Sequence, residues 1–186
     1  MGDASDRCPP PFLLDEDSAM EWALEKGNLD LPDEGDDPRG HRRELRRYRL
    51  LAAEYVLFAE GVCEAGRVTL YRSVEVPRSR HWSRGVEMDQ LGIYWSAERG
   101  GAGVYNRIDH GVPVREVLMV AVATPDSVDW EGGFRSFLAY GESEWEITLK
   151  PRRRVWLVEV DGEALARPLA GNTGSMKERK VARGAR

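Results

Sequence analysis

The chain has 186 residues, of which 41% are hydrophobic, and it carries a net charge of −5. This length suits one domain with a buried core, and the acidic charge argues against a general nucleic-acid binder. Residues 1–40 hold twelve acidic and three basic residues, whereas residues 161–186 hold three acidic and six basic residues. We therefore expect an acidic, partly disordered segment at 1–40, a folded domain at 41–162 and a basic flexible tail at 163–186.

Cys8 and Cys63 are the only cysteines. Two thiols make neither a disulfide framework nor a four-ligand zinc site, so the sequence predicts reduced cysteines in a cytoplasmic protein. The chain opens on no signal-peptide pattern, and no apolar run is long enough for a membrane span. His41, His81 and His110 lack ligand spacing, so we expect no metal site.

Helical periodicity marks the first third of the chain. A short helix is expected over Ala19–Lys26, capped by Asp17 or Ser18. A mobile linker at 28–40 follows, because this acidic stretch is interrupted by proline and glycine. The strongest helix is expected over His41–Glu60, where apolar residues recur at three- and four-residue spacing.

Arginines cover one end of that main helix: Arg42, Arg43, Arg46, Arg47 and Arg49. They could bind phosphates. The alternative is a solvated helix face that pairs with the acidic N-terminal segment.

The second half of the chain changes to the patterns of extended strands. Residues 77–90 and 125–141 are expected to be loops, and the second of these carries Gly132-Gly133. Strands are expected over Arg67–Val76, Leu91–Ser96, Val114–Thr124, 142–149 and, as the last strand, Val155–Val160. Helices followed by strands predict an α+β fold with a mainly antiparallel sheet.

Alternating glutamates mark the strand at 142–149, where Glu142, Glu144 and Glu146 alternate with Trp145 and other residues. Successive side chains of a strand point to opposite faces, so Glu144 and Glu146 share one face about 7 Å apart. Such a pair suits chemistry at a sugar carbon, where one carboxylate stabilises positive charge and the other takes a proton. The alternative is a half-exposed strand with a solvated acidic face.

Three further features have both a functional and a structural interpretation. Arg72, inside an apolar strand, requires an anion such as a phosphate, or else it pairs with a neighbouring acid at an edge. Ser96, at a strand end, could orient a carboxylate or touch a ribose, or it simply ends the strand. Phe137 and Tyr140, before the acidic strand, could stack on a substrate, or they pack the loop against the sheet.

An arginine on a first strand, a serine on a second and Glu-X-Glu on a later strand resemble the Arg–Ser–Glu class of mono-ADP-ribosyltransferases. The resemblance covers roughly Leu70 to Val160. It implies an ADP-ribosyltransferase-like split β-sandwich with N-terminal helices, in which two small facing sheets clamp NAD as the co-substrate. It also implies transfer of ADP-ribose to a protein acceptor, possibly at an arginine, with release of nicotinamide. A toxin or effector role would fit.

The resemblance also implies roles for individual residues. Ser96 would position the catalytic carboxylate, Glu146 would stabilise an oxocarbenium-like centre, and Glu144 would activate the acceptor. Phe137 or Tyr140 would help to select the target. NAD would be held by Arg72 with Tyr71 and Ser73 of its own strand, and by Trp95, which precedes Ser96 on the second strand.

The chain departs from the family pattern in three places. Ser73 stands where the family often has glycine, and the Ser-Thr-Ser motif is reduced to Ser96 alone. The acidic strand offers two registers, Glu142/Glu144 or Glu144/Glu146, and the hydrophobic run after Glu146 favours the second. An alternative function is a weak or inactive nucleotide-binding or protein-interaction domain of the same fold.

Overall fold

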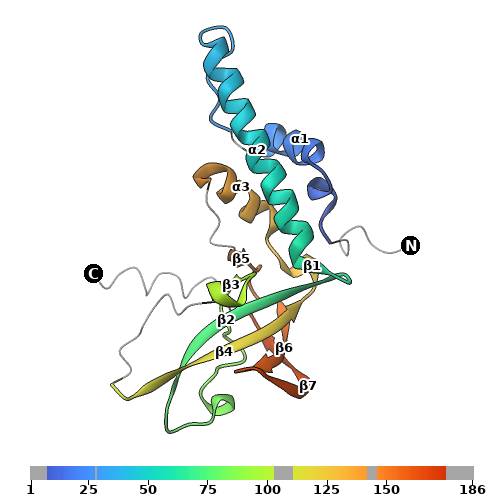
Figure 1. Cartoon of the computed structure of the whole chain (residues 1–186). Helices are drawn as coiled ribbons and strands as arrows, with labels where there is room; N and C mark the ends of the chain where they lie inside the picture. Colours follow the sequence, from blue (N-terminus) through green and yellow to red (C-terminus); the bar gives the residue numbers. More distant parts are fainter. Residues whose placement is uncertain (1–7, 28, 103–110, 142–145, 175–186) are drawn as a thin grey trace.

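A computed structural model describes residues 8–27, 29–102, 111–141 and 146–174. Within these ranges the α-helices gather at one end of the molecule and the sheet at the other (Figure 1). The helices are α1 (Glu16–Lys26), α2 (Pro38–Val62) and α3 (Trp130–Tyr140). The strands are β1 (Cys63–Glu64), β2 (Arg67–Pro77), β3 (Tyr94–Ser96), β4 (Val114–Ala123), β5 (Glu146–Thr148), β6 (Arg154–Val160) and β7 (Glu163–Asn172). Short 3-10 turns lie at Pro11–Leu13, Trp82–Arg84, Arg99–Gly101 and Pro125–Ser127.

The described strands form one antiparallel sheet in the order β5-β3-β2-β4-β6-β7, with β1 paired to β2. The longest strand pairing in the sheet joins β2 and β4, which stay in register from Val68↔Ala123 to Pro77↔Val114. The prediction of an α+β fold with an antiparallel sheet is therefore confirmed.

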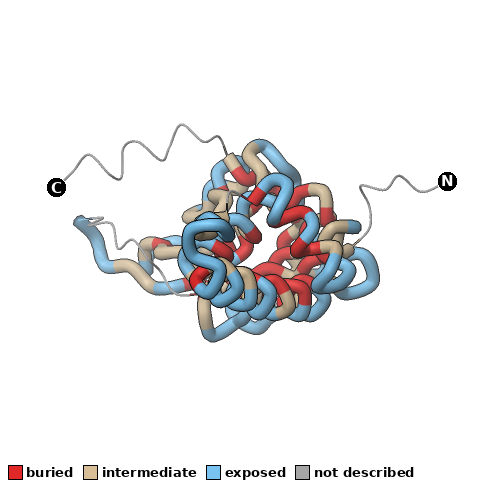
Figure 2. The backbone as a smooth tube through the Cα atoms, turned by 90° about the horizontal axis from the view of Figure 1, so that it is seen from above, coloured by how far each residue is buried: buried red, intermediate tan, exposed pale blue. Residues whose placement is uncertain are grey.

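The core lies between the helices and the face of the sheet that they cover, which we call the inner face. Seen from above, the buried residues line the interior of the molecule (Figure 2). Phe134 of α3 has no exposed surface and lies at the centre of an aromatic cluster. Its ring centroid is 5.1 Å from that of Tyr55, 5.6 Å from that of Trp22 and 6.1 Å from that of Phe12. Four aromatic rings from four segments therefore join the helices.

Residues 125–141 are not a loop, as the sequence suggested, but a 3-10 turn followed by α3. Glycine pairs disfavour helices, which is why the sequence misled. Here each glycine meets a neighbour at close range. A Cβ at Gly133 would lie 2.5 Å from the Tyr55 hydroxyl, and a Cβ at Gly132 would meet the capping carboxylate of Asp129. Close packing of α3 on α2 thus outweighs helix propensity.

The expected boundaries of the folded region are also wrong. β7 follows the strand that we expected to be last and pairs with β6, so the sheet continues to Asn172. β7 has few β-branched residues and contains Pro168, which an edge strand tolerates. Before residue 41, α1 packs into the core, and α2 already begins at Pro38. Asp15 caps α1 by accepting from the Ser18 N–H at 2.7 Å, so this helix starts earlier than predicted.

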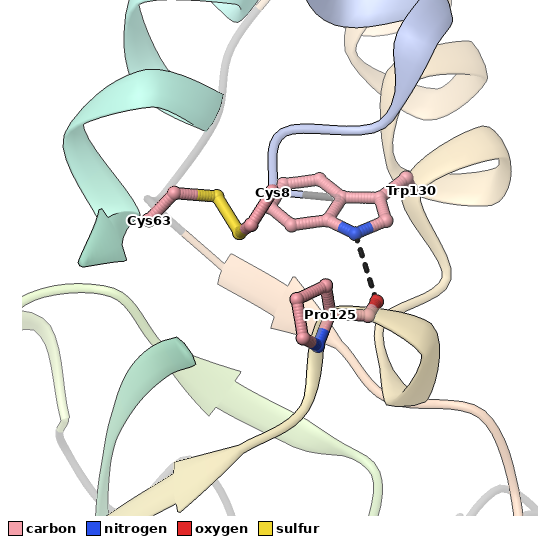
Figure 3. Close-up of a disulfide and its surroundings, with 4 residues drawn as sticks. All are labelled: Cys8, Cys63, Pro125 and Trp130. Carbon is pink, nitrogen blue, oxygen red and sulfur yellow. Dashed lines mark hydrogen bonds between the residues drawn. A yellow bond between two sulfur atoms is a disulfide. The ribbon is translucent and has the colours of Figure 1, made fainter. Parts of the chain in front are cut away.

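Cys8 and Cys63 are joined in a disulfide, which corrects the prediction of two reduced thiols. The bond ties residues 8–15, which precede α1 and which we call the N-terminal strap, to the end of α2. It lies beside Trp130, whose indole N–H donates to the Pro125 carbonyl at 3.0 Å (Figure 3). The pairing could not be read from the sequence, because the two cysteines are 55 residues apart and meet only when the strap crosses α2.

Candidate functional site at the forked edge of the sheet

The strands that carry Arg72, Ser96 and Glu146 are neighbours, in the order β2, β3 and β5. Ser96 pairs with Tyr71 on one side and with Glu146 on the other. Directly paired residues share a face of a sheet, so Tyr71, Ser96 and Glu146 lie on one face. Arg72 is the next residue along β2, so its side chain leaves the strand on the inner face.

The sheet forks next to these residues. β2 and β3 pair only at Tyr71↔Ser96, whereas β3 and β5 stay paired at three successive positions. One position further on, at Ser73, the backbone N–H of β2 donates to the Ala102 carbonyl at 2.9 Å rather than to β3. We call this region, bounded by β2, β3 and Ala102, the fork.

The Arg72 side chain fills the fork. Its Nη1 donates to the Tyr94 carbonyl at 2.8 Å, and its guanidinium carbon lies 5.9 Å from the centre of the Trp95 ring. A Cβ at Gly92 would lie 2.4 Å from Nη1, so only glycine leaves room for this arrangement. Gly92 also has a φ of +75°, which favours glycine.

Two opposing effects act on the pKa of Arg72. Burial lowers the pKa of the guanidinium, and the negative charge of Glu146 raises it again. An arginine stays protonated in proteins, so the fork holds a partly desolvated positive charge. The interaction with Glu146 links the two predicted site residues across the sheet.

Glu146 and Ser96 differ sharply in exposure. Glu146 is exposed at the start of β5, while Ser96 is buried. The Ser96 hydroxyl donates to the Glu98 carbonyl at 2.8 Å and accepts from the Glu98 N–H at 3.0 Å. Ser96 therefore holds the turn after β3, and no hydrogen bond from it to Glu146 occurs among the described residues. Glu142 and Glu144 lie outside the described residues.

The aromatic residues of the prediction divide into buried and exposed ones. Trp95 is 2% exposed, and its indole N–H donates to the Gly92 carbonyl at 3.1 Å, so it supports the fork from within the core. Phe137 is buried against Tyr55, which corrects its expected role in contacting a substrate. Tyr140, at the end of α3, is 79% exposed and accessible to a large partner.

Sequence reasoning assigned no role to Gly92 or Ala102 and did not single out Arg99. The Arg99 guanidinium carbon lies 5.7 Å from the centre of the Tyr71 ring, and its Nη2 lies 2.6 Å from the Glu159 carboxylate on β6. Arg99 thus adds a second positive charge close to Tyr71, on the same face as Glu146. A glycine directly after an apolar residue and before a strand was the only available signal, and it does not identify a partner in space.

A hollow of about 480 Å³ lies apart from the fork, between the N-terminal strap and α3. Phe12 and Trp130 contribute apolar walls, and its lysine and one of its acids are already engaged. Lys150 Nζ donates to the Asp126 carbonyl at 3.0 Å, and Asp129 caps α3. This hollow therefore offers little unpaired charge for a ligand.

Among the described residues, no group of three or more histidine, cysteine, aspartate or glutamate side chains could hold a metal ion. None of the described helices is both long and apolar enough to cross a membrane. No family model, curated protein or solved structure matches the chain.

Proposed function

We propose that this chain transfers ADP-ribose from NAD to a protein side chain and releases nicotinamide. The observation that carries the proposal is the placement of Arg72, Ser96 and Glu146, which follow one another along the chain as in the Arg–Ser–Glu class, on three neighbouring strands. The forked sheet supports the finer expectation of a split β-sandwich, because β3 and β5 leave β2 on one side of Arg72.

The charges around the fork suit this reaction. Cleavage of the bond between ribose and nicotinamide sends the electron pair to the nicotinamide nitrogen and leaves an oxocarbenium-like ribose. The exposed carboxylate of Glu146 would stabilise that positive centre. The attacking group of the acceptor then bonds to the ribose carbon, and a carboxylate, assigned to Glu144 by the resemblance, takes its proton.

Arg72 would supply positive charge for the diphosphate. A guanidinium has five N–H donors, and one hydrogen bond, to Tyr94, holds it in place. Arg99, which stacks near Tyr71, is a second candidate for this role. Ser96 would act on the reaction by holding the turn after β3 and therefore the position of its neighbour Glu146.

The test is nicotinamide release from NAD by the full chain, with a lysate as a source of acceptors. We expect release by the wild type and a loss of at least about 100-fold for Glu146→Gln, because the transition-state charge loses its partner. Glu163→Gln is the matched control, since Glu163 is an exposed acid on β7 at the far edge of the sheet. Wild-type protein that releases no nicotinamide, or a Glu146→Gln variant as active as the wild type, contradicts the proposal.

A second candidate function is a non-catalytic nucleotide-binding domain of the same fold. The hydroxyl of Ser96 is bonded to Glu98, and Arg72 is bonded to the backbone of β3, so both groups already have structural partners. Calorimetry with NAD would then show binding, and the products would show no turnover. Nicotinamide release that depends on Glu146 excludes this candidate.

A further inference from the structure

A single stripe of α2 faces solvent along the whole helix. Leu50 is 66% exposed and Leu57 is 67% exposed, so this stripe carries two large apolar side chains at the surface. The stripe consists of exposed residues spaced by three or four positions: Arg39, Arg43, Arg46, Leu50, Glu54, Leu57 and Gly61. Such spacing places them on one side of a helix. The N-terminal end of α2 also extends beyond α1 and α3 (Figure 1), so this face is accessible there.

The two halves of α2 carry opposite charge. Residues 38–49 contain six arginines and one glutamate, whereas residues 51–64 contain three glutamates and no lysine or arginine. This order opposes the helix macrodipole, which favours acids at the N-terminus and bases at the C-terminus. An antiparallel neighbour with the same charge pattern would relieve this repulsion at both ends.

Several of these charges have no internal ion-pair partner. In the part of the chain that the structure describes, Arg46, Arg39 and Glu54 make no ion pair, while Arg43 and Arg47 contact Glu44 and Arg49 reaches α1. Among the described residues, an ion pair with the acidic N-terminal segment is therefore made by Arg49 alone, with Glu16 and Asp17.

The residues of the stripe are spaced symmetrically about Leu50. α2 has 25 residues from Pro38 to Val62, so Leu50 is its midpoint. A two-fold axis at Leu50 would bring a second α2 alongside the first over its full length. Arg46 of one copy would then face Glu54 of the other, and Arg43 would face Leu57. The same contact occurs twice, as in any isologous interface.

A hollow of about 390 Å³ lies where the arginines of the second copy would arrive. Leu57, Phe58 and Gly61 form its apolar part, and the carboxylates of Glu54 and Glu98 lie at its sides. An apolar surface beside carboxylates fits an arginine, whose stem packs on apolar groups and whose guanidinium bonds to carboxylates.

We propose that two copies of this chain associate by antiparallel packing of α2 on α2 about a two-fold axis at Leu50. This proposal is independent of the ADP-ribosyltransferase proposal. One pair of helices makes a small interface, which buries less than the roughly 1,200 Å² of surface found in stable complexes. We therefore expect a dissociation constant in the micromolar range.

Sedimentation velocity of the full chain, from about 1 to 100 μM, measures the association directly. We expect a monomer–dimer equilibrium that weakens as salt rises. Arg46→Glu and Glu54→Arg should each weaken the dimer at least about 10-fold, and the double variant should recover most of that loss. Residues 46 and 54 are about 12 Å apart along one helix, so recovery reports a contact between copies. Unchanged melting midpoints show that each variant is folded.

Cross-linking provides the second readout. Leu50→Cys should form a covalent dimer under mild oxidation, since the axis brings the two thiols together. Leu24→Cys is the matched control, because Leu24 is 58% exposed on α1 and lies off the stripe. A wild type that stays monomeric at 100 μM overturns the proposal, as does a double variant no tighter than the single ones. A monomer that instead binds labelled nucleic acid through Arg46 assigns the arginines to phosphate contacts and also overturns it.

Discussion

The inner face of the sheet is covered in different ways in the helical half of the molecule and at the fork. Under the helices, the inner face of the sheet is covered by apolar side chains centred on Phe134, which has no exposed surface. At the fork, the same inner face is covered by one arginine, held by a carbonyl of β3 and a glycine. Apolar packing is non-directional and tolerant, whereas the fork depends on one hydrogen bond and one close approach.

Under the proposed function, this difference assigns ligand binding and catalysis to the fork. A partly buried positive charge, whose pKa is lowered by burial and raised again by Glu146 across the sheet, is a costly arrangement for stability alone. The helical half instead provides the rigid support from which β5 and its glutamate extend. The comparison predicts that substitutions in the helical half act mainly on stability, and that those at the fork act mainly on ligand binding and catalysis.

The largest expected effect is in the helical half. Phe134→Ala removes the ring that contacts Phe12, Trp22 and Tyr55 and should lower the free energy of unfolding by about 4 kcal/mol. Denaturant unfolding measures the loss. Tyr140→Ala, on the exposed end of the same helix, should change stability by less than about 0.5 kcal/mol. Equal losses for the two variants would contradict the assignment of Phe134 to the centre of the core.

The next largest effect should come from the disulfide, which also belongs to the helical half. Replacing Cys8 and Cys63 by serine opens a loop that the bond closes across 55 residues, and should cost about 3 kcal/mol. Thermal unfolding with and without a reductant measures this. The wild type should lose stability on reduction, and the serine double variant should not respond. A wild type that is insensitive to reductant would show that the bond does not form in solution.

A smaller effect is expected at the fork. Gly92→Ala should lower stability by about 2 kcal/mol, because alanine is strained at positive φ and its Cβ would displace the Arg72 guanidinium. Gly66→Ala is the matched control, since Gly66 has a φ of +72° and no atom within 4 Å of an added Cβ. The excess loss at Gly92 measures the close approach. Equal losses would mean that Arg72 moves aside freely.

The smallest effect is a pH dependence at the cap of α1. Hydrogen bonds from Ser18 to Asp15 lower the pKa of this carboxyl below its usual 3.8. The stabilisation by the carboxylate is therefore complete above the ordinary pKa and disappears as the pH falls through the lowered one. Asp15→Asn should be less stable than the wild type at pH 7 and equal to it at low pH. pH-dependent unfolding of the two proteins measures this, and an Asp15→Asn variant that stays less stable than the wild type at low pH would contradict the assignment.

The sequence by itself determined the α+β class, the main helix and the strands that carry Arg72, Ser96 and Glu146. Local periodicity was enough for this, because helix and strand patterns depend on neighbours within a few residues. The arginine, the serine and the glutamate were also visible as residue types that are unusual in their strands.

Only the tertiary structure decided how those residues are used. Gly132 and Gly133 lie in α3 at positions where Asp129 and Tyr55 leave no room for a Cβ, so tertiary packing requires glycine there. Cys8 meets Cys63 because the N-terminal strap crosses the end of α2. Ser96 turns to Glu98, and Arg72 fills the fork, because β3 leaves β2 after a single pair. Each of these contacts joins segments whose approach depends on the packing of the whole chain, which local sequence patterns do not encode.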